Sequence, residues 1–182
     1  PRSTLFPYTT LFRSGRITTV VLDKTGTITK GQPAVTNVVL RDAKLSEDEL
    51  LRLAASVEKG SEHPLGEALV AEAGERHLEL STPEGFRAEA GHGVEATVDG
   101  RTVWVGSPRM MEARGLLLDG LETEIERLQS EGKTAMLVGL DGTVAGIVAV
   151  ADTVKESSRE AIATLHRMGL TVVMLTGDNR QT

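Results

Sequence analysis

The two ends of this chain carry the same kind of segment, a short apolar run that leads into hydroxyl, glycine and acidic residues. Residues 17–23 (ITTVVLD) are rich in β-branched side chains and are followed by Lys-Thr-Gly-Thr. Residues 171–175 (TVVML) are followed by Thr-Gly-Asp. Runs of this length and composition are typical of buried parallel strands. The pattern predicts two adjacent strands of an α/β sheet, with a ligand site beyond their carboxyl ends.

A helix is expected immediately before the second of these strands. Apolar side chains recur at helical spacing between residues 161 and 168, and Gly169 is a typical stop signal. Ser157 or Ser158 can cap the amino end of this helix. Residues 155–175 therefore have the pattern of a helix followed by a parallel strand.

The sequence between the two strands, from residue 32 to residue 150, has the pattern of a separate inserted domain. Ser46-Glu-Asp-Glu49 is a capping box that opens one helix, and Pro64 opens another. Asp99-Gly100 and Asp141-Gly142 are pairs typical of hairpin turns. Further elements are strands at 86–90, 94–98, 102–105, 134–140 and 144–150, and a helix near 121–129. The insert is predicted to be an α+β unit with an antiparallel sheet.

Composition excludes several classes of protein. The chain of 182 residues is 40% hydrophobic and 25% charged with a net charge of −6, which is in the range of globular proteins and argues against a nucleic-acid surface. Cysteine is absent, which excludes disulfides, thiol catalysis and cysteine-based zinc sites. Glycine and aspartate residues interrupt the most apolar region, 135–151, so no run approaches the ~18 residues of a membrane span.

Both ends of the chain are unusual. Three of the five aromatic residues, Phe6, Tyr8 and Phe12, lie within the first 14 positions. Residues 4–14 resemble the in-frame translation of a sequencing-library adapter, so residues 1–14 are expected to be an adapter-derived artefact. A natural edge strand or a degenerate signal peptide is the alternative. Both ends are expected to be cuts in a longer protein.

The sharpest chemical feature is Asp23-Lys-Thr-Gly-Thr27, which directly follows a predicted strand. A carboxylate at this point can attack a phosphoryl group when Mg²⁺ and fixed donors neutralise the phosphate oxygens. Thr25 can offer its backbone carbonyl to the metal, Gly26 permits close backbone approach, and Thr27 can donate its hydroxyl to phosphate. Phosphatases with a similar loop usually have a second acid where this chain has Thr25, so an aspartyl-phosphate at Asp23 is expected to persist.

This loop resembles the phosphorylation signature of the P-type ATPases, which Asp23-Lys-Thr-Gly-Thr-Ile-Thr29 matches. The segment Thr176-Gly-Asp-Asn179 is similar to the second phosphate-domain motif of that family. The alternative is a surface turn that ends a Rossmann-like strand. The resemblance implies Asp23 and Thr25 as Mg²⁺ ligands. It implies the following catalytic residues: Asp23, Lys24, Thr25, Thr27, Thr176, Gly177 and Asp178.

The insert resembles the nucleotide-binding domain of the heavy-metal-transporting branch of this family. Ser61-Glu-His-Pro64 is similar to its adenine-site motif, in which His63 would contact the purine and Glu58 would accept from its exocyclic amine. A helix cap is the alternative role for His63. Gly91-His-Gly-Val94 is similar to the family's Gly-x-Gly loop, and His92 is interpreted as a variable position in it.

A later segment, 105–111, resembles a nucleotide-side turn of the same branch. Only Gly106 is carried over from it, because the family often has Asn where this chain has Ser107. The nucleotide contacts implied by the resemblance are therefore Glu58, His63, Gly91, Gly93, Val94 and Gly106.

The resemblance covers residues 16–182 and implies a HAD-like, Rossmannoid α/β phosphorylation domain, incomplete in this chain. That domain would comprise residues 15–31 and 151–182, with the α+β nucleotide-binding domain inserted at residues 32–150 and Asp152–Lys155 as the returning hinge.

The function implied is that of the headpiece of an ATP-driven heavy-metal pump, most like the copper(I) exporters, with ATP and Mg²⁺ as cofactors. Membrane helices outside this chain would bind the transported ion, and the headpiece would lie on the cytoplasmic face of the cell membrane. The chain alone is expected to bind ATP with little or no turnover. The alternatives are a zinc/cadmium exporter, a soluble HAD-like phosphatase and a regulatory module that only binds nucleotide.

Overall fold

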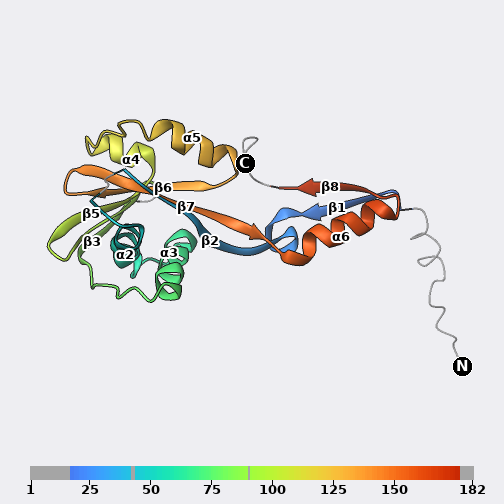
Figure 1. The fold of residues 1–182 in the computed structure, drawn as a ribbon, viewed down its shortest axis with the longest axis horizontal. Helices are drawn as coiled ribbons and strands as arrows, with labels where there is room; N and C mark the ends of the chain where they lie inside the picture. The colour runs from blue at the N-terminus through green and yellow to red at the C-terminus, as the bar shows by residue number, and fades with distance from the viewer. Residues whose placement is uncertain (1–16, 42–43, 90, 177–182) are drawn as a thin grey trace, which may run out of the picture. The chain divides into compact units, whose positions relative to one another are not determined.

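The computed structural model describes residues 17–41, 44–89 and 91–176, which belong to two compact units (Figure 1). The smaller unit comprises residues 17–31 and 154–176, and the larger unit comprises residues 32–153. No helix within the described ranges is both long enough and apolar enough to span a lipid bilayer.

The larger unit is built on a six-stranded sheet in the order β2-β7-β6-β5-β4-β3. Strands β3 to β7 pair antiparallel with their neighbours in this order, as predicted for the insert. Asp99 and Gly100 have φ of 52° and 77°, and Asp141 and Gly142 have φ of 48° and 91°, so both Asp-Gly pairs form the predicted hairpin turns. The strands are β2 (Thr29–Leu40), β3 (Glu84–Glu89), β4 (Gly93–Val98), β5 (Arg101–Gly106), β6 (Thr134–Leu140) and β7 (Thr143–Val154).

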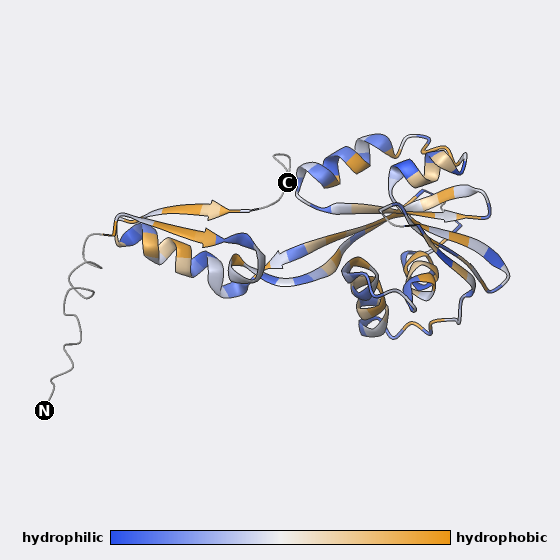
Figure 2. Ribbon diagram, turned by 180° about the vertical axis from the view of Figure 1, so that it is seen from behind, coloured by the Kyte–Doolittle hydropathy of each residue, from blue (hydrophilic) through white to orange (hydrophobic). Residues whose placement is uncertain are grey.

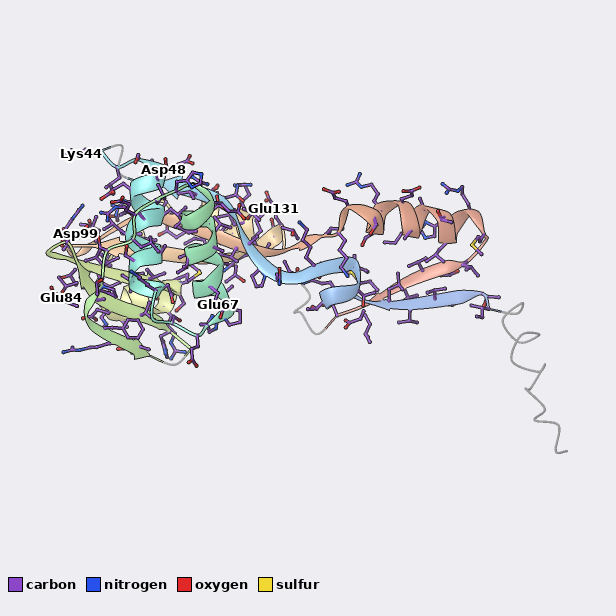
Figure 3. The ribbon with its side chains drawn as sticks, turned by 90° about the horizontal axis from the view of Figure 1, so that it is seen from below. Lys44, Asp48, Glu67, Glu84, Asp99 and Glu131 are labelled. Atoms are coloured by element: carbon purple, nitrogen blue, oxygen red, sulfur yellow. The ribbon has the colours of Figure 1, made fainter. Side chains whose placement is uncertain are left out.

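Helices cover both faces of this sheet (Figure 1). Helices α2 (Glu47–Glu58) and α3 (Pro64–Glu75) cover one face, and α4 (Pro108–Ala113) and α5 (Glu122–Ser130) cover the other. Along β6, Met136 and Val138 join the apolar cluster of α2 and α3, whereas Ala135 and Leu137 join that of α4 and α5. Because both faces are buried, β6 is an unbroken apolar run. Charged side chains such as Asp48, Glu67 and Glu131 lie on the surface of this unit (Figure 3).

The helix starts in the larger unit follow the local signals. The Ser46 hydroxyl accepts from the Glu49 amide at 3.1 Å and so caps α2, as the capping box predicts. Pro64 occupies the first turn of α3, also as predicted. Helix α4 was not expected from the sequence, although Ser107 followed by proline is a start signal, and the Ser107 hydroxyl accepts from the Met110 amide at 3.3 Å.

The smaller unit pairs β1 (Thr19–Asp23) parallel to β8 (Thr171–Leu175), with α6 (Glu156–Arg167) beside them. The prediction that these two strands are parallel neighbours is confirmed. The prediction that they are buried is wrong: Val21 is 59% exposed and Leu175 is 63% exposed. Within the described residues the sheet has only two strands, and alternate side chains have no second layer above them. Figure 2 shows the apolar character of both strands.

The predicted cap of α6 is also wrong. The helix begins at Glu156 with Lys155 as its N-cap residue, and neither Ser157 nor Ser158 caps it. The Ser158 hydroxyl instead donates to the carbonyl of Ile28 at 2.7 Å. Gly169 has a φ of 78° and follows the end of the helix, as predicted.

Candidate functional site

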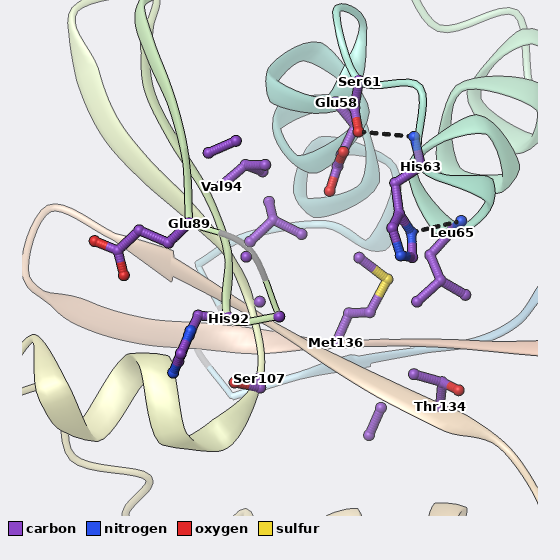
Figure 4. Close-up of a pocket in the computed structure, with 16 residues that line it drawn as sticks. Glu58, Ser61, His63, Leu65, Glu89, His92, Val94, Ser107, Thr134 and Met136 are labelled. Carbon is purple, nitrogen blue, oxygen red and sulfur yellow. Dashed lines mark hydrogen bonds between the residues drawn. The ribbon is translucent and has the colours of Figure 1, made fainter.

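A pocket of about 330 Å³ opens in the larger unit between the α2–α3 connection, the β3–β4 turn and the start of β6 (Figure 4). Every residue that the sequence assigned to nucleotide contact lines this pocket. These residues are Glu58, His63, Gly91, Gly93, Val94 and Gly106. The fold thus brings together three motifs that are far apart in the chain.

Glu58 is the last residue of α2 and brings a carboxylate to the pocket. It is only 4% exposed, and its buried Oε2 has no hydrogen-bond partner among the described residues. Burial raises the pKa of the Glu58 carboxyl above its ordinary value of 4.5, and the Ser61 hydroxyl and His63 act in the opposite direction. A buried acceptor without a donor is unfavourable. This oxygen lies against Gly66 of α3, where an added Cβ would be 2.4 Å from it, so a ligand in the pocket would meet the other side of the carboxylate.

His63 is both a helix cap and a pocket residue. Its Nδ1 accepts from the backbone amide of Leu65 at 3.2 Å, so the predicted alternative of a cap holds as well. With Nδ1 used as an acceptor, the neutral ring carries its proton on Nε2. The Ser61 hydroxyl accepts from the His63 amide at 3.2 Å, which fixes the backbone before the helix. Figure 4 shows the ring directed into the pocket, near Met136.

Two glycines on adjacent strands leave no room for side chains. Gly93 on β4 lies opposite Gly106 on β5. A Cβ at Gly93 would lie 2.3 Å from the Val105 carbonyl oxygen, and a Cβ at Gly106 would lie 2.4 Å from the His92 carbonyl oxygen. The close approach of these strands makes their backbone part of the pocket wall.

Gly91 differs from these two glycines. It has a φ of 74°, which favours glycine, but an added Cβ would meet nothing within 4 Å. Glycine is therefore favoured at this position by the backbone conformation of the turn before β4, and not by close packing.

Other residues of the pocket were missed by the sequence reasoning. His92, interpreted as a variable loop position, and Ser107, set aside because the family often has Asn there, both line it. Ser107 carried a signal, since it is a helix cap before proline. Thr134, Ala135 and Met136 carried none, because they lie in an apolar strand that has the pattern of core. The pocket is completed by Ser61, Leu65, Ala88, Glu89 and Val105.

In the smaller unit, Asp23 ends β1 and leads into a tight turn, η1 (Lys24–Ile28). Gly26 has a φ of 74° in this turn. The buried hydroxyl of Thr29 donates to the Lys24 carbonyl at 2.9 Å and accepts from the Gly26 amide at 3.3 Å. The side chains of Asp23 and Thr27 are exposed at the surface of the smaller unit.

The amino end of α6 holds the same turn. The Lys155 ammonium donates to the Gly26 carbonyl, and the Lys155 amide donates to the Ile28 carbonyl at 3.0 Å. Together with the bond from Ser158, these contacts give the turn a fixed backbone before any ligand is present.

The second predicted phosphate motif begins at the same edge of the two-stranded sheet. Asp23 is paired with Leu175, so Thr176 follows β8 where η1 follows β1. Gly177 and Asp178, which were predicted to act beside Thr176, lie outside the described residues. Within the described ranges, no group of three or more His, Cys, Asp or Glu residues could hold a metal ion. The oxygen donors predicted for Mg²⁺, the Asp23 carboxylate and the Thr25 carbonyl, are of the type that this ion prefers.

Comparisons with known proteins agree with these features. The family model of haloacid dehalogenase-like hydrolases matches residues 17–182. The chain is 45% identical over 172 residues to the copper-exporting P-type ATPase of Bacillus subtilis, covering 94% of this chain and 21% of the relative. The chain thus spans about a fifth of the length of this curated relative.

Solved structures show the same likeness. A zinc-transporting PIB-type ATPase matches with a TM-score of 0.84 and 41% identity, over 92% of this chain and 27% of that one. The N-domain of HMA6, a copper-transporting P-type ATPase, matches with a TM-score of 0.56 and 30% identity, over 66% of this chain and 99% of that one. The chain belongs to the haloacid dehalogenase-like hydrolase family, and its relatives within that family are heavy-metal P-type ATPases.

Proposed function

We propose that this chain is the ATP-binding and phosphorylation part of an ATP-driven pump that exports copper(I) through an aspartyl-phosphate at Asp23. The observation that carries the proposal is the convergence of three predicted motifs on one pocket, which the buried residue Glu58 also lines. The larger unit would be the nucleotide-binding domain predicted at residues 32–150. The smaller unit would belong to the phosphorylation domain.

In the pocket, Glu58 would accept a hydrogen bond from the exocyclic amine of adenine. His63 would contact the base with its ring, and its Nδ1 bond to the Leu65 amide would keep that ring in place. The backbone at Gly91, Gly93 and Gly106 would lie against the rest of the nucleotide, since glycine permits the closest approach. Selectivity for adenine over guanine would come from the edge of the base, because Glu58 offers an acceptor where adenine has an amine and guanine a carbonyl.

At the phosphorylation loop, a carboxylate oxygen of Asp23 would attack the γ-phosphorus of ATP, and the bond from that phosphorus to the departing ADP oxygen would break. Asp23 and the Thr25 carbonyl would hold Mg²⁺, which neutralises charge on the phosphate oxygens when it is bound. Lys24 and Thr27 would stabilise the phosphoryl group from the same turn, and Thr176, Gly177 and Asp178 would act from the neighbouring strand end. The aspartyl-phosphate would persist because Thr25 offers no carboxylate to activate water.

Export of copper(I) is inferred from the copper-exporting relative, and in the complete pump this part would lie at the cytoplasmic face of a membrane. Zinc or cadmium export is a second candidate, because the zinc-transporting structure matches at 41% identity. A soluble phosphatase accounts less well for the nucleotide-type pocket in the larger unit.

Calorimetric titration of this chain with ATP, AMP and GTP tests the proposal. ATP and AMP should bind, and GTP should bind more weakly. His63→Ala should weaken ATP binding about tenfold or more, because it removes the ring that contacts the base. His166→Ala, an exposed histidine on α6 in the smaller unit, is the matched control and should leave the affinity unchanged. A folded chain that binds none of these nucleotides would overturn the proposal.

A further inference from the structure

Met136 occupies a particular place in the pocket. It lies on β6, is 7% exposed and points to the sheet face that carries α2 and α3. It lines the pocket together with His63 and Leu65 (Figure 4). No motif of the sequence singled it out, because its strand has the pattern of buried core.

The polar side chains of the pocket and its apolar surface come from different elements of the fold. Glu58, Ser61 and His63 come from the α2–α3 connection and can reach the edge of a base. A flat aromatic base also needs an apolar surface against its face. Val105 is fully buried, whereas Val94 and Met136 are each 7% exposed, and Met136 is the larger of these two side chains. Met136 is the large side chain of β6 that reaches the pocket below His63.

The chemistry of methionine suits this position. The side chain is unbranched and its thioether is polarisable, so it can adapt to a flat ring and make favourable sulfur–aromatic contacts. Its neighbour Leu137 packs on the other face of the sheet, in the cluster of α4 and α5. Of these two adjacent apolar residues, only Met136 lines the pocket.

We propose that Met136 is an apolar platform on which the nucleotide base packs. The inference rests on the proposed nucleotide binding and adds a residue that sets affinity through the face of the base. A platform touches the base and not the phosphates. Met136 therefore contributes the same factor to the affinities for ATP, AMP and adenosine.

Methionine-methyl NMR reports the contact directly. The chain contains five methionines, and Met136→Leu identifies the resonance of Met136. Saturation with AMP should move the Met136 methyl resonance upfield, because a methyl group that faces an aromatic ring lies in its shielding region. The methyl of Met111, which is fully buried in the other cluster, should stay in place. If AMP binds and the Met136 methyl resonance does not move, the proposed role of Met136 is wrong, and the proposed nucleotide site stands. A chain that binds no adenine nucleotide would overturn both.

Affinities of variants give a second test. Met136→Ala should weaken ATP, AMP and adenosine by a similar factor of about ten. Val138→Ala is the matched control for loss of packing, because Val138 is buried on the same face of β6 and does not line the pocket. It should leave all three affinities unchanged in a folded chain. Equal losses in both variants, or a loss confined to ATP, would contradict the proposal.

Discussion

The two units of this chain bury their apolar residues to very different extents. Within the described residues, Ile28 is the only buried hydrophobic residue of the smaller unit, and all the others lie in the larger unit. Most of the exposed large hydrophobic side chains, by contrast, lie in the smaller unit, where Val21, Val173 and Leu175 of the two-stranded sheet are 44–63% exposed. The pocket thus lies in a well-packed unit, whereas the turn after Asp23 is held mainly by hydrogen bonds.

The residues of the two sites are held in place in different ways. In the larger unit, strand pairing and helices on both faces of the sheet set the positions of the pocket residues. In the smaller unit, the turn after Asp23 depends on a few donors from Thr29, Lys155 and Ser158. Substitutions should therefore have large, global effects in the first unit and small, local effects in the second.

The largest effect is expected at Gly93. Gly93→Ala should destabilise the larger unit by about 3–5 kcal/mol, because the φ of 149° is unfavourable for alanine and the new Cβ would lie 2.3 Å from a backbone oxygen. Gly91→Ala is the control and should cost only about 1 kcal/mol, since its Cβ meets open space. Urea denaturation measures both. Equal costs would show that the close strand approach does not constrain this wall of the pocket.

Core truncation compares the two units directly. Leu137→Ala, at a fully buried site in the larger unit, should lower the free energy of unfolding by about 3 kcal/mol. Val21→Ala, at a site 59% exposed, should change it by no more than about 0.5 kcal/mol. If Val21→Ala costs as much as Leu137→Ala in thermal or urea unfolding, the contrast between the units is wrong.

A smaller, local effect is expected in the turn after Asp23. Ser158→Ala removes the donor to the Ile28 carbonyl and should cost about 1.5 kcal/mol, and the Lys155 amide still satisfies that carbonyl. Amide hydrogen exchange should speed up in β1 and the start of α6 and stay unchanged in β6. Ser157→Ala, at the exposed neighbouring position, should have no such effect. Faster exchange throughout the larger unit would mean that the contact is not local.

The smallest effect on stability is expected at Glu58, where the size of the effect depends on pH. Because its pKa is raised in the folded state, the wild-type chain loses stability as the pH rises from about 4.5 through that raised value. Glu58→Gln removes this loss and should raise the free energy of unfolding by about 1 kcal/mol at pH 7 while weakening ATP binding. The difference between the two chains should vanish below pH 4.5. A variant less stable than the wild type at pH 7 would contradict the role of burial.

The local signals in the sequence predicted those elements whose ends are set by neighbouring residues. The Asp-Gly hairpins, the cap at Ser46 and the start of α3 at Pro64 all depend on interactions within a few positions. The cap of α6 was predicted wrongly because Ser158 bonds to a carbonyl 130 positions away. Strand β2 was missed because it contains Pro33 and polar residues and is held by its pairing with β7.

The pocket shows the same contrast between residues in local motifs and residues placed by distant contacts. The six residues predicted to contact nucleotide lie in short motifs, and the structure gathers them around one cavity. Met136 has no motif around it and reaches the cavity only through the register of β6 in the sheet. The exposure of Val21 could not be predicted from the neighbouring residues either, because it depends on which elements cover the strand.

The most direct test of this account is an amide NMR titration of the chain with AMP. The account predicts shifts at the residues around the pocket, from Glu58 to Leu65, from Gly91 to Val94 and from Thr134 to Met136. Amides of β1, α6 and β8 should not shift, because AMP has no γ-phosphate to bring toward Asp23. Saturable shifts centred on the smaller unit, with the pocket amides unchanged, would contradict the assignment of nucleotide binding to the larger unit.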